Sequence, residues 1–68
     1  MARMTLKAAR INAGFTQKDA AREIGISNKT LGLWEAGVSF PKTNKIDKIC
    51  DLYGLCYNDI IFLAKDPL

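Results

Sequence analysis

Histidine is absent from this 68-residue chain, and cysteine is scarce, with only Cys50 and Cys56. Two thiols without an imidazole are too few ligands for a zinc site. They also do not form the disulfide framework of a small secreted domain, so we expect them to be small buried or capping side chains. No base accompanies either thiol and no phosphate-binding loop is present, so we predict neither an enzyme nor a cofactor.

Long apolar runs are missing as well. No stretch approaches the ~20 apolar residues of a membrane span, and Arg3, Lys7 and Arg10 interrupt the N-terminus before a signal-peptide core could form. We therefore expect a cytoplasmic protein without a membrane partner. Hydrophobic residues make up 49% of the chain and charged residues 25%, which is typical of a globular protein. Residues 1–68 are predicted to form one small domain.

Negative charge is sparse in the first two thirds of the chain. Residues 1–45 hold eight Lys and Arg against three Asp and Glu, a net charge of +5. Residues 46–68 hold two Lys against four Asp, a net charge of −2. The positive part favours a polyanion as partner. A solvated surface with unevenly placed charges explains the same numbers, so charge alone leaves both interpretations open.

Helical patterns recur along the chain with short breaks, and no alternating strand pattern lasts more than a few residues. We predict helices at about residues 3–13, at about residues 17–24 after an N-cap at Thr16, and between an N-cap at Ser27 and Gly37. Two more are predicted at about residues 44–53 and 57–64. Five short helices in so small a chain indicate a compact, orthogonal all-α domain.

The segment QKDAAREIGISNKTLGLWEA, residues 17–36, has the pattern of a helix-turn-helix, in which two helices cross steeply after a short turn. Ala21 is small enough for the crossing, and Gly25 allows the positive φ that the turn needs. The positions expected to face inward are all apolar: Ile24, Ile26, Leu31 and Trp34.

With this segment the chain resembles the DNA-binding domain of the lambda-repressor and Cro family, the XRE-type helix-turn-helix. LKAARINAGFTQ is similar to the first helix of that family, and KIDKICDLYGLCYNDII is similar to its fourth and fifth helices. The resemblance covers about residues 5–63. It implies a five-helix, cytoplasmic transcriptional regulator that binds operator DNA, in most members as a two-fold dimer.

The outer face of the predicted third helix carries little charge. On a helical wheel Lys29 and Leu33 lie opposite the core residue Leu31, and Asn28 and Gly32 lie on the flank. Lysine can donate to guanine, asparagine can bind adenine bidentately, and leucine can contact a thymine methyl group. A glycine lets bases approach the backbone closely. We therefore predict base contacts by Asn28, Lys29, Gly32 and Leu33. Two alternatives remain open: Leu33 packs against a neighbour that the sequence does not reveal, and Gly32 is simply tolerated in the helix.

Phosphate contacts are predicted at two helix starts, because free backbone N–H groups there bind anions. Gln17 begins the second helix and is followed by Lys18. In the resembled family this glutamine often touches the DNA backbone and braces the start of the third helix. The other group of candidates is Lys42, Thr43, Asn44 and Lys45. For each lysine taken singly, a solvated side chain is an equal alternative.

Arg10 and Glu35 are predicted to be structural rather than DNA-reading residues. The wheel places Glu35 near the core edge, where an unpaired charge is costly. The resembled family often pairs an arginine of the first helix with a glutamate at this position. The resemblance therefore implies an Arg10–Glu35 ion pair, which could also aim Arg10 at a phosphate.

The predicted fifth helix supplies the remaining surface. Ile61 and Phe62 cannot both be buried together with Tyr57 and Ile60 in so short a helix. An exposed apolar patch indicates a partner, so we predict a homodimer interface at Ile61 and Phe62. A two-fold dimer would place its two third helices about 34 Å apart. Plain core packing is the alternative.

These observations favour a sequence-specific DNA-binding regulator, a small phage- or mobile-element-type repressor that binds a palindromic operator as a dimer. No small-molecule ligand is evident, and the chain ends soon after the predicted fifth helix, so we expect no sensing or cleavage domain. Two alternatives stay open: an antitoxin that represses its own operon, and a protein-interaction adaptor that keeps the fold without reading bases. Salt-dependent DNA binding would distinguish the adaptor from the other two.

Overall fold

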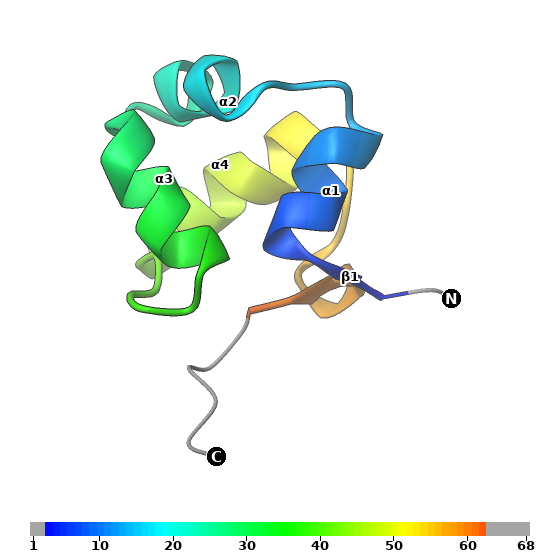
Figure 1. Ribbon diagram of the computed structural model, residues 1–68. Coiled ribbons are helices and arrows are strands. Elements are labelled where there is room, and N and C mark those ends of the chain that lie inside the picture. Colours follow the sequence, from blue (N-terminus) through cyan, green and yellow to red (C-terminus); the bar gives the residue numbers. More distant parts are fainter. Residues whose placement is uncertain (1–2, 63–68) are drawn as a thin grey trace.

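Four α-helices make up most of the computed structural model, which describes residues 3–62 (Figure 1). They are α1 (Leu6–Asn12), α2 (Gln17–Ile24), α3 (Asn28–Glu35) and α4 (Thr43–Tyr53). The remaining elements are β1 (Met4–Thr5), the 3₁₀ turn η1 (Tyr57–Asp59) and β2 (Ile60–Ile61). No helix in the described range is both long and apolar enough to cross a membrane.

Hydroxyl side chains begin the first three helices. The Oγ1 atoms of Thr5 and Thr16 and the Oγ of Ser27 each accept the backbone N–H three residues further on, at 3.1, 3.1 and 3.0 Å. Losing such an N-cap typically costs about 1 kcal/mol, because it leaves a helix-end N–H group without a partner. The N-caps predicted at Thr16 and Ser27 are confirmed.

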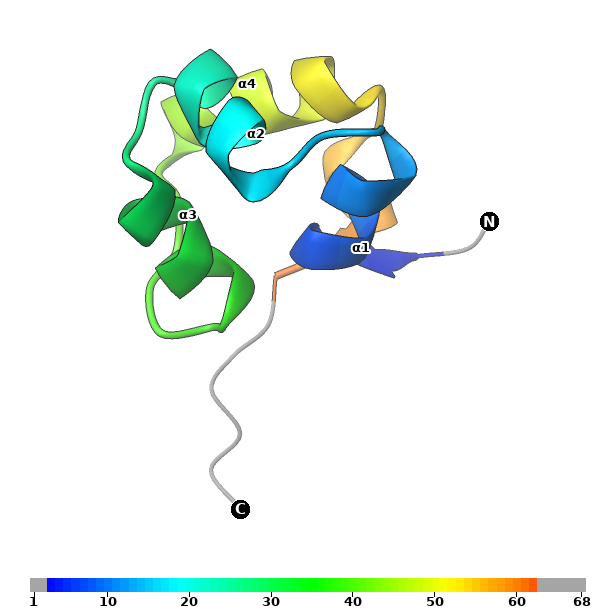
Figure 2. The same ribbon diagram turned by 45° about the horizontal axis from the view of Figure 1, so that its top comes forward.

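The turn between α2 and α3 depends on Gly25. Its φ is +88°, in the left-handed region that strains residues with a Cβ. The N–H of Ile26 then donates to the carbonyl of Ala21 at 2.9 Å and closes the end of α2. Figure 2 shows α3 leaving α2 at a steep angle after this short turn. The helix-turn-helix geometry expected for residues 17–36 is therefore present.

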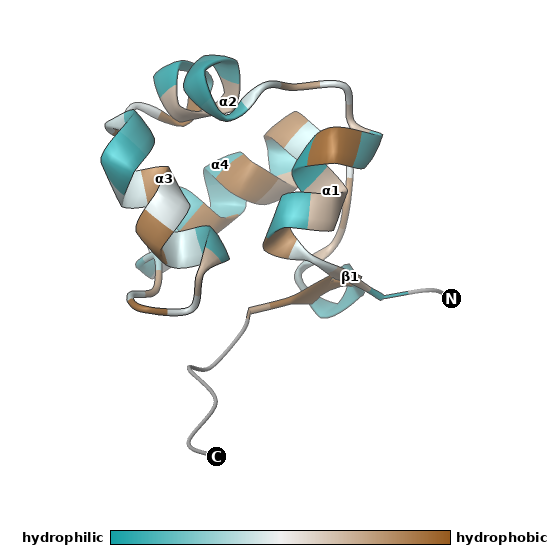
Figure 3. Ribbon diagram, in the orientation of Figure 1, coloured by the Kyte–Doolittle hydropathy of each residue, from teal (hydrophilic) through white to brown (hydrophobic). Residues whose placement is uncertain are grey.

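The core lies where the four helices meet the small sheet. Ala20 and Ala21 of α2 are at most 2% exposed, so their small side chains let neighbouring helices come close. The buried apolar residues are Leu6, Ala9, Ala20, Ala21, Ile24, Leu31, Trp34, Ile49, Tyr53 and Ile60. In Figure 3, β2 is hydrophobic along its length, and one of its two isoleucines belongs to this core.

The fifth helix expected at residues 57–64 is not confirmed. After η1 the chain becomes β2, which pairs in parallel with β1 through Met4 opposite Ile60 and Thr5 opposite Ile61. β-branched isoleucines suit a strand, and the N-terminal segment supplies backbone partners that a local helical pattern does not reveal. Residues 63 and 64 lie outside the described residues. The fold is thus mostly helical, with four α-helices and a two-stranded sheet between residues 3 and 62.

The same strand pairing shortens the first helix, which was predicted from residue 3. Because Met4 and Thr5 belong to β1 and Thr5 is the N-cap, α1 begins only at Leu6. The predicted boundaries of α2 match the structure, and α4 begins one residue earlier than predicted.

Candidate nucleic-acid interface

One side of α3 packs on the core and the opposite side meets solvent. Leu31 and Trp34 are buried, whereas Asn28 and Lys29 are exposed at the start of the helix. Leu33 is 36% exposed on the same outer side as Lys29. Lys29 and Leu33 therefore lie on the accessible outer side of α3, and Asn28 is exposed on its flank.

Gly32 faces the side chain of Gln17. A Cβ built at residue 32 would lie 3.6 Å from both Oε1 and Nε2 of Gln17, an ordinary van der Waals distance. The side chain nearest to Gly32 is thus that of Gln17 in the same protein. The sequence alone did not indicate this contact. A methyl group therefore fits there without a clash.

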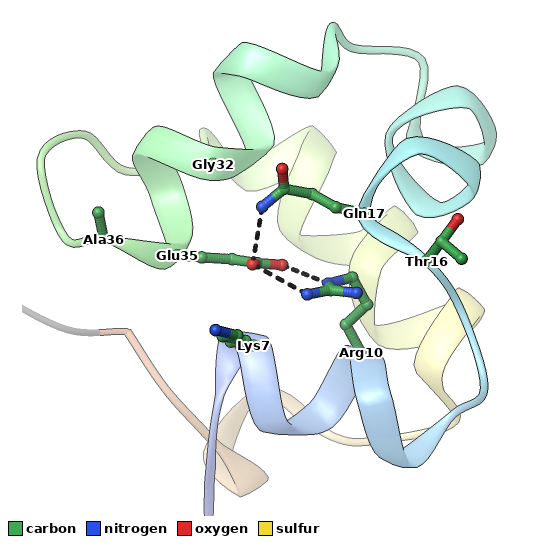
Figure 4. Close-up of a pocket in the computed structure, with 7 residues that line it drawn as sticks. All are labelled: Lys7, Arg10, Thr16, Gln17, Gly32, Glu35 and Ala36. Carbon is green, nitrogen blue, oxygen red and sulfur yellow. Dashed lines mark hydrogen bonds and ion pairs between the residues drawn. The ribbon is translucent and has the colours of Figure 1, made fainter.

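Arg10 and Glu35 lie in direct contact between α1 and α3 (Figure 4). The Arg10 Nε donates to Glu35 Oε2 at 2.7 Å, and Nη2 lies 3.4 Å from Oε1. The two side chains are only 9% and 5% exposed. The third nitrogen, Nη1, donates to the carbonyl of Phe15 at 2.9 Å. These three contacts use three of the five guanidinium N–H groups, so Nη1 and Nη2 each keep one N–H, and a phosphate contact of Arg10 stays a prediction.

Gln17 joins this ion pair from α2. Its Nε2 donates to Glu35 Oε1 at 3.1 Å, so the glutamine links the beginning of α2 to the last turn of α3. The resemblance had implied that it braces the start of the third helix, and the structure places it at the other end. Eighteen residues separate Gln17 from Glu35, so no local sequence pattern could have identified this hydrogen bond.

The residues predicted to hold phosphate at α4 separate into two groups. Lys42, Thr43 and Asn44 are exposed around the helix start. Lys45 is half-buried, and its Nζ lies 3.3 Å from the carbonyl oxygen of Ile24, the last residue of α2. A cation at a helix C-terminus is favourable, because the last carbonyls carry partial negative charge. Lys45 therefore has a partner inside the protein, and we expect it to support the end of α2 rather than to hold a phosphate. Lys18 is exposed on α2.

The two residues predicted to form a dimer interface are half-buried rather than exposed. Ile61 lies in β2 opposite Thr5, and the ring of Phe62 stacks on Tyr57 with centroids 5.6 Å apart. Tyr57 itself is 57% exposed. The expectation of an exposed helical patch is therefore wrong, while a contact between two copies at this end of the molecule stays a prediction.

Sequence reasoning missed three residues that lie close to α3. Lys7 of α1 lies beside Glu35 in Figure 4 and had been read only as a charge that interrupts an apolar run. Val38 and Phe40 follow α3 in a loop and are 56% and 53% exposed. The N–H of Val38 donates to the Leu33 carbonyl at 3.0 Å, which folds the loop back onto the helix.

The cysteines take no part in this surface. Both thiols are free. Partial burial, followed by nearby carboxylates such as Asp47, raises the pKa of the Cys50 thiol and keeps it protonated at neutral pH. Cys56 is exposed at the start of η1.

The comparisons with known proteins agree with this geometry. The model of the helix-turn-helix family matches residues 6–56. The chain is 40% identical over 63 residues to the HTH-type transcriptional regulator ImmR of Bacillus subtilis. This aligned region covers 93% of the present chain and 48% of ImmR. The chain is also 38% identical over 56 residues to antitoxin PezA of Streptococcus pneumoniae. This second aligned region covers 82% of the present chain and 35% of PezA. The chain thus spans about half, or less, of the length of these relatives.

Proposed function

Because the chain belongs to the helix-turn-helix family, we propose that it binds double-stranded DNA and regulates transcription. The observation that carries the proposal is the exposed part of α3, with Lys29 and Leu33 on its outer side and Asn28 on its flank, while Leu31 and Trp34 hold the helix on the core. A helix fits the major groove of B-DNA. In this proposal Lys29 donates to guanine, Asn28 binds adenine, and Leu33 contacts a thymine methyl group.

The contacts that set the position of the protein on DNA come from the elements around α3. Gln17 and Lys18 lie at the start of α2, and Lys42, Thr43 and Asn44 lie around the start of α4. The net charge of +5 in residues 1–45 supports a polyanionic partner. Gly32 contributes by leaving space beside Gln17 rather than by a contact of its own.

The short length of α3 favours a two-fold dimer on a palindromic operator. The eight residues of α3 form a helix of about 12 Å, which reaches only a few base pairs. One copy measures 33 × 29 × 21 Å. Two copies whose α3 helices lie one DNA turn apart, about 34 Å, are therefore close enough to touch. We propose Ile61 and Phe62, next to the exposed Tyr57, as part of that contact. Sedimentation with and without operator tests it, because a protein that stays monomeric in both has no such interface.

A phage- or mobile-element-type repressor is the specific role that we favour. An antitoxin that represses its own operon is the second candidate, since one relative is named antitoxin PezA. The two roles differ in their partner. An antitoxin protects cells when it is co-expressed with a toxic protein encoded beside it. A repressor without such a partner binds operator DNA but gives no such protection.

Selection of bound DNA from a random pool tests the proposed function. We expect a two-fold symmetric consensus whose affinity falls steeply between 50 and 200 mM salt, because each phosphate contact releases counterions. Recovery of unenriched DNA, together with binding that does not change with salt, would instead indicate an adaptor that keeps the fold without reading bases.

A further inference from the structure

Exposed apolar side chains mark the place where α3 ends and the following loop begins. Leu33 is 36% exposed, Val38 56% and Phe40 53%, and we call these three residues the loop patch. In the described part of the chain, the apolar side chains that pack against the core include none of them. Figure 3 shows a hydrophobic stretch in this loop. Neither the fold nor the DNA contacts proposed above use Val38 or Phe40.

The loop after α3 is fixed to the helix by backbone hydrogen bonds. The N–H of Gly37, whose φ is +78°, donates to the Trp34 carbonyl at 3.2 Å. The N–H of Val38 donates to the Leu33 carbonyl at 3.0 Å. These two bonds form the Schellman motif, which commonly brings the side chains at the positions of Val38 and Leu33 into contact. Pro41 is buried at the other end of the loop. The loop patch is therefore held in place before a partner binds, which lowers the entropic cost of binding.

The charges around the loop patch are positive. Lys29 lies one helical turn before Leu33 on the outer side of α3, and Lys42 is exposed at the far end of the loop. Glu35 is the only acidic residue between residues 24 and 46, and its carboxylate is buried in the ion pair with α1. A partner that covers the loop patch therefore gains from acidic side chains around its contact area.

A protein suits the loop patch better than DNA does. Protein–DNA interfaces are polar and strongly positive, and the apolar group that the major groove offers is the thymine methyl. Leu33 alone can use such a methyl group, so DNA leaves the valine and the phenyl ring beside it without an apolar partner. The centres of protein–protein interfaces, in contrast, are poor in charge and rich in aromatic side chains.

We propose that the loop patch is a docking surface for an acidic segment of a partner protein. Apolar side chains of that segment pack on Val38 and Phe40, and its carboxylates face Lys29 and Lys42. Because Lys29 and Leu33 also belong to the side of α3 that is proposed to read DNA, the partner and the operator compete for the protein. The docking itself does not depend on the proposed function, and only this competition rests on it.

A library of short random peptides displayed on phage, selected against the full chain, tests the docking surface. The proteins compared are the wild type, the double variant Val38→Ser/Phe40→Ser and, as matched control, Ile11→Ser, which removes an apolar side chain that is 58% exposed on α1. We expect enrichment of peptides that combine apolar residues with Asp or Glu. They should bind the wild type and Ile11→Ser equally and the double variant about tenfold more weakly. Rising salt should weaken them, and excess selected operator should displace them.

No enriched peptide, or peptides that bind the double variant as tightly as the wild type, would show that the loop patch is not a docking surface. The double variant also distinguishes other occupants. If it loses about tenfold in operator affinity and Ile11→Ser does not, the loop patch contacts DNA. If the wild type self-associates and the double variant does not, the loop patch contacts a second copy. Either result overturns the proposal. A wild type that binds the peptides through the loop patch but binds no selected DNA would instead overturn the proposed function.

Discussion

Glu35 shows at the scale of one residue how this small domain accommodates a buried charge. Its carboxylate receives three hydrogen bonds, two from Arg10 of α1 and one from Gln17 of α2. Removing an ion from water costs several kcal/mol, and this cost is offset only when its partners are well placed. The loss of one partner is therefore worse than the loss of both, because a single deletion leaves the other charge buried alone.

Arg10→Met and Glu35→Leu should each destabilise the fold by about 3–5 kcal/mol, and the double variant should lose less than the sum. Urea unfolding measures the free energies, with an osmolyte such as TMAO added to all samples so that the single variants stay folded. Additive losses would mean that the 2.7 Å contact between the two side chains does not couple them energetically.

Tyr53 is the opposite case, a buried polar group without a partner. Its hydroxyl finds no hydrogen bond among the residues that the structure describes, although its ring packs on Phe15 with centroids 6.1 Å apart. Burial and, second, the Glu35 charge raise the pKa of Tyr53 to about 12, while Arg10 acts in the other direction. The folded state therefore strongly prefers the neutral phenol.

Tyr53→Phe should keep or raise stability, by about 1 kcal/mol, because it removes an unsatisfied hydroxyl. The pH dependence has a definite sign. The folded-state pKa is above the ordinary value of 10.0, so the contribution of Tyr53 is complete below pH 10 and is lost as pH rises toward 12. The difference between wild type and Tyr53→Phe should therefore widen in favour of the variant across that range. A loss of 1 kcal/mol or more at pH 7 would reveal a hydrogen-bond partner for the hydroxyl.

Among the helices and strands, α4 packs on α2 and stabilises the point where the turn of the helix-turn-helix begins. Lys45 places its ammonium 3.3 Å from the carbonyl of Ile24, at the point where α2 ends and the turn begins. Three residues earlier, Lys42 is exposed and makes no side-chain cap. Two neighbouring lysines of the same segment therefore have different expected roles, one internal and one toward DNA.

Lys45→Ala should lower stability by about 0.3–1 kcal/mol, since it removes a cation from a helix C-terminus, and should leave the salt dependence of DNA binding unchanged. Lys42→Ala should do the reverse, with stability unchanged and a salt slope reduced by about one unit. Urea unfolding and DNA titrations at several salt concentrations measure both quantities. A reduced slope in Lys45→Ala would return Lys45 to the phosphate contacts.

The glycine inside α3 can be tested in the same way. Gly32→Ala should stabilise the protein by up to about 1 kcal/mol, because alanine favours a helix and the new methyl group meets Gln17 at an ordinary distance. The same variant should bind the operator more weakly if DNA uses the open space beside Gln17. Higher stability with unchanged operator affinity would show that the open space at residue 32 does not serve DNA.

At the scale of the whole molecule, what the sequence could predict depended on distance along the chain. Thr16, Gly25 and Ser27 act on their immediate neighbours, so they were sufficient to place α2, the turn and α3. The pairing of β1 with β2 joins the two ends of the described chain, and the helical spacing around Ile60 concealed it.

The candidate site follows the same rule. The outer face of α3 depends only on helical periodicity, so a wheel predicted which of its side chains are exposed. The hydrogen bond between Gln17 and Glu35 and the cap that Lys45 forms on α2 each require two helices to pack together, and the hollow that Lys7, Gln17 and Gly32 line requires three. These contacts could be recognised only once that packing was known.

Lys29 offers the sharpest test of whether the exposed side of α3 contacts DNA bases. The measurement is the affinity of the wild type, Lys29→Ala and the α4 control Lys48→Ala for the selected operator and for each of its single-base variants. Lys29→Ala should lose roughly 1–3 kcal/mol on the best operator and should no longer distinguish bases at one guanine-containing pair in each half-site. Lys48→Ala should keep both affinity and preference. If Lys29→Ala retains the full base preference of the wild type at every position, Lys29 does not contact a base, and the proposed role of α3 in base recognition is wrong.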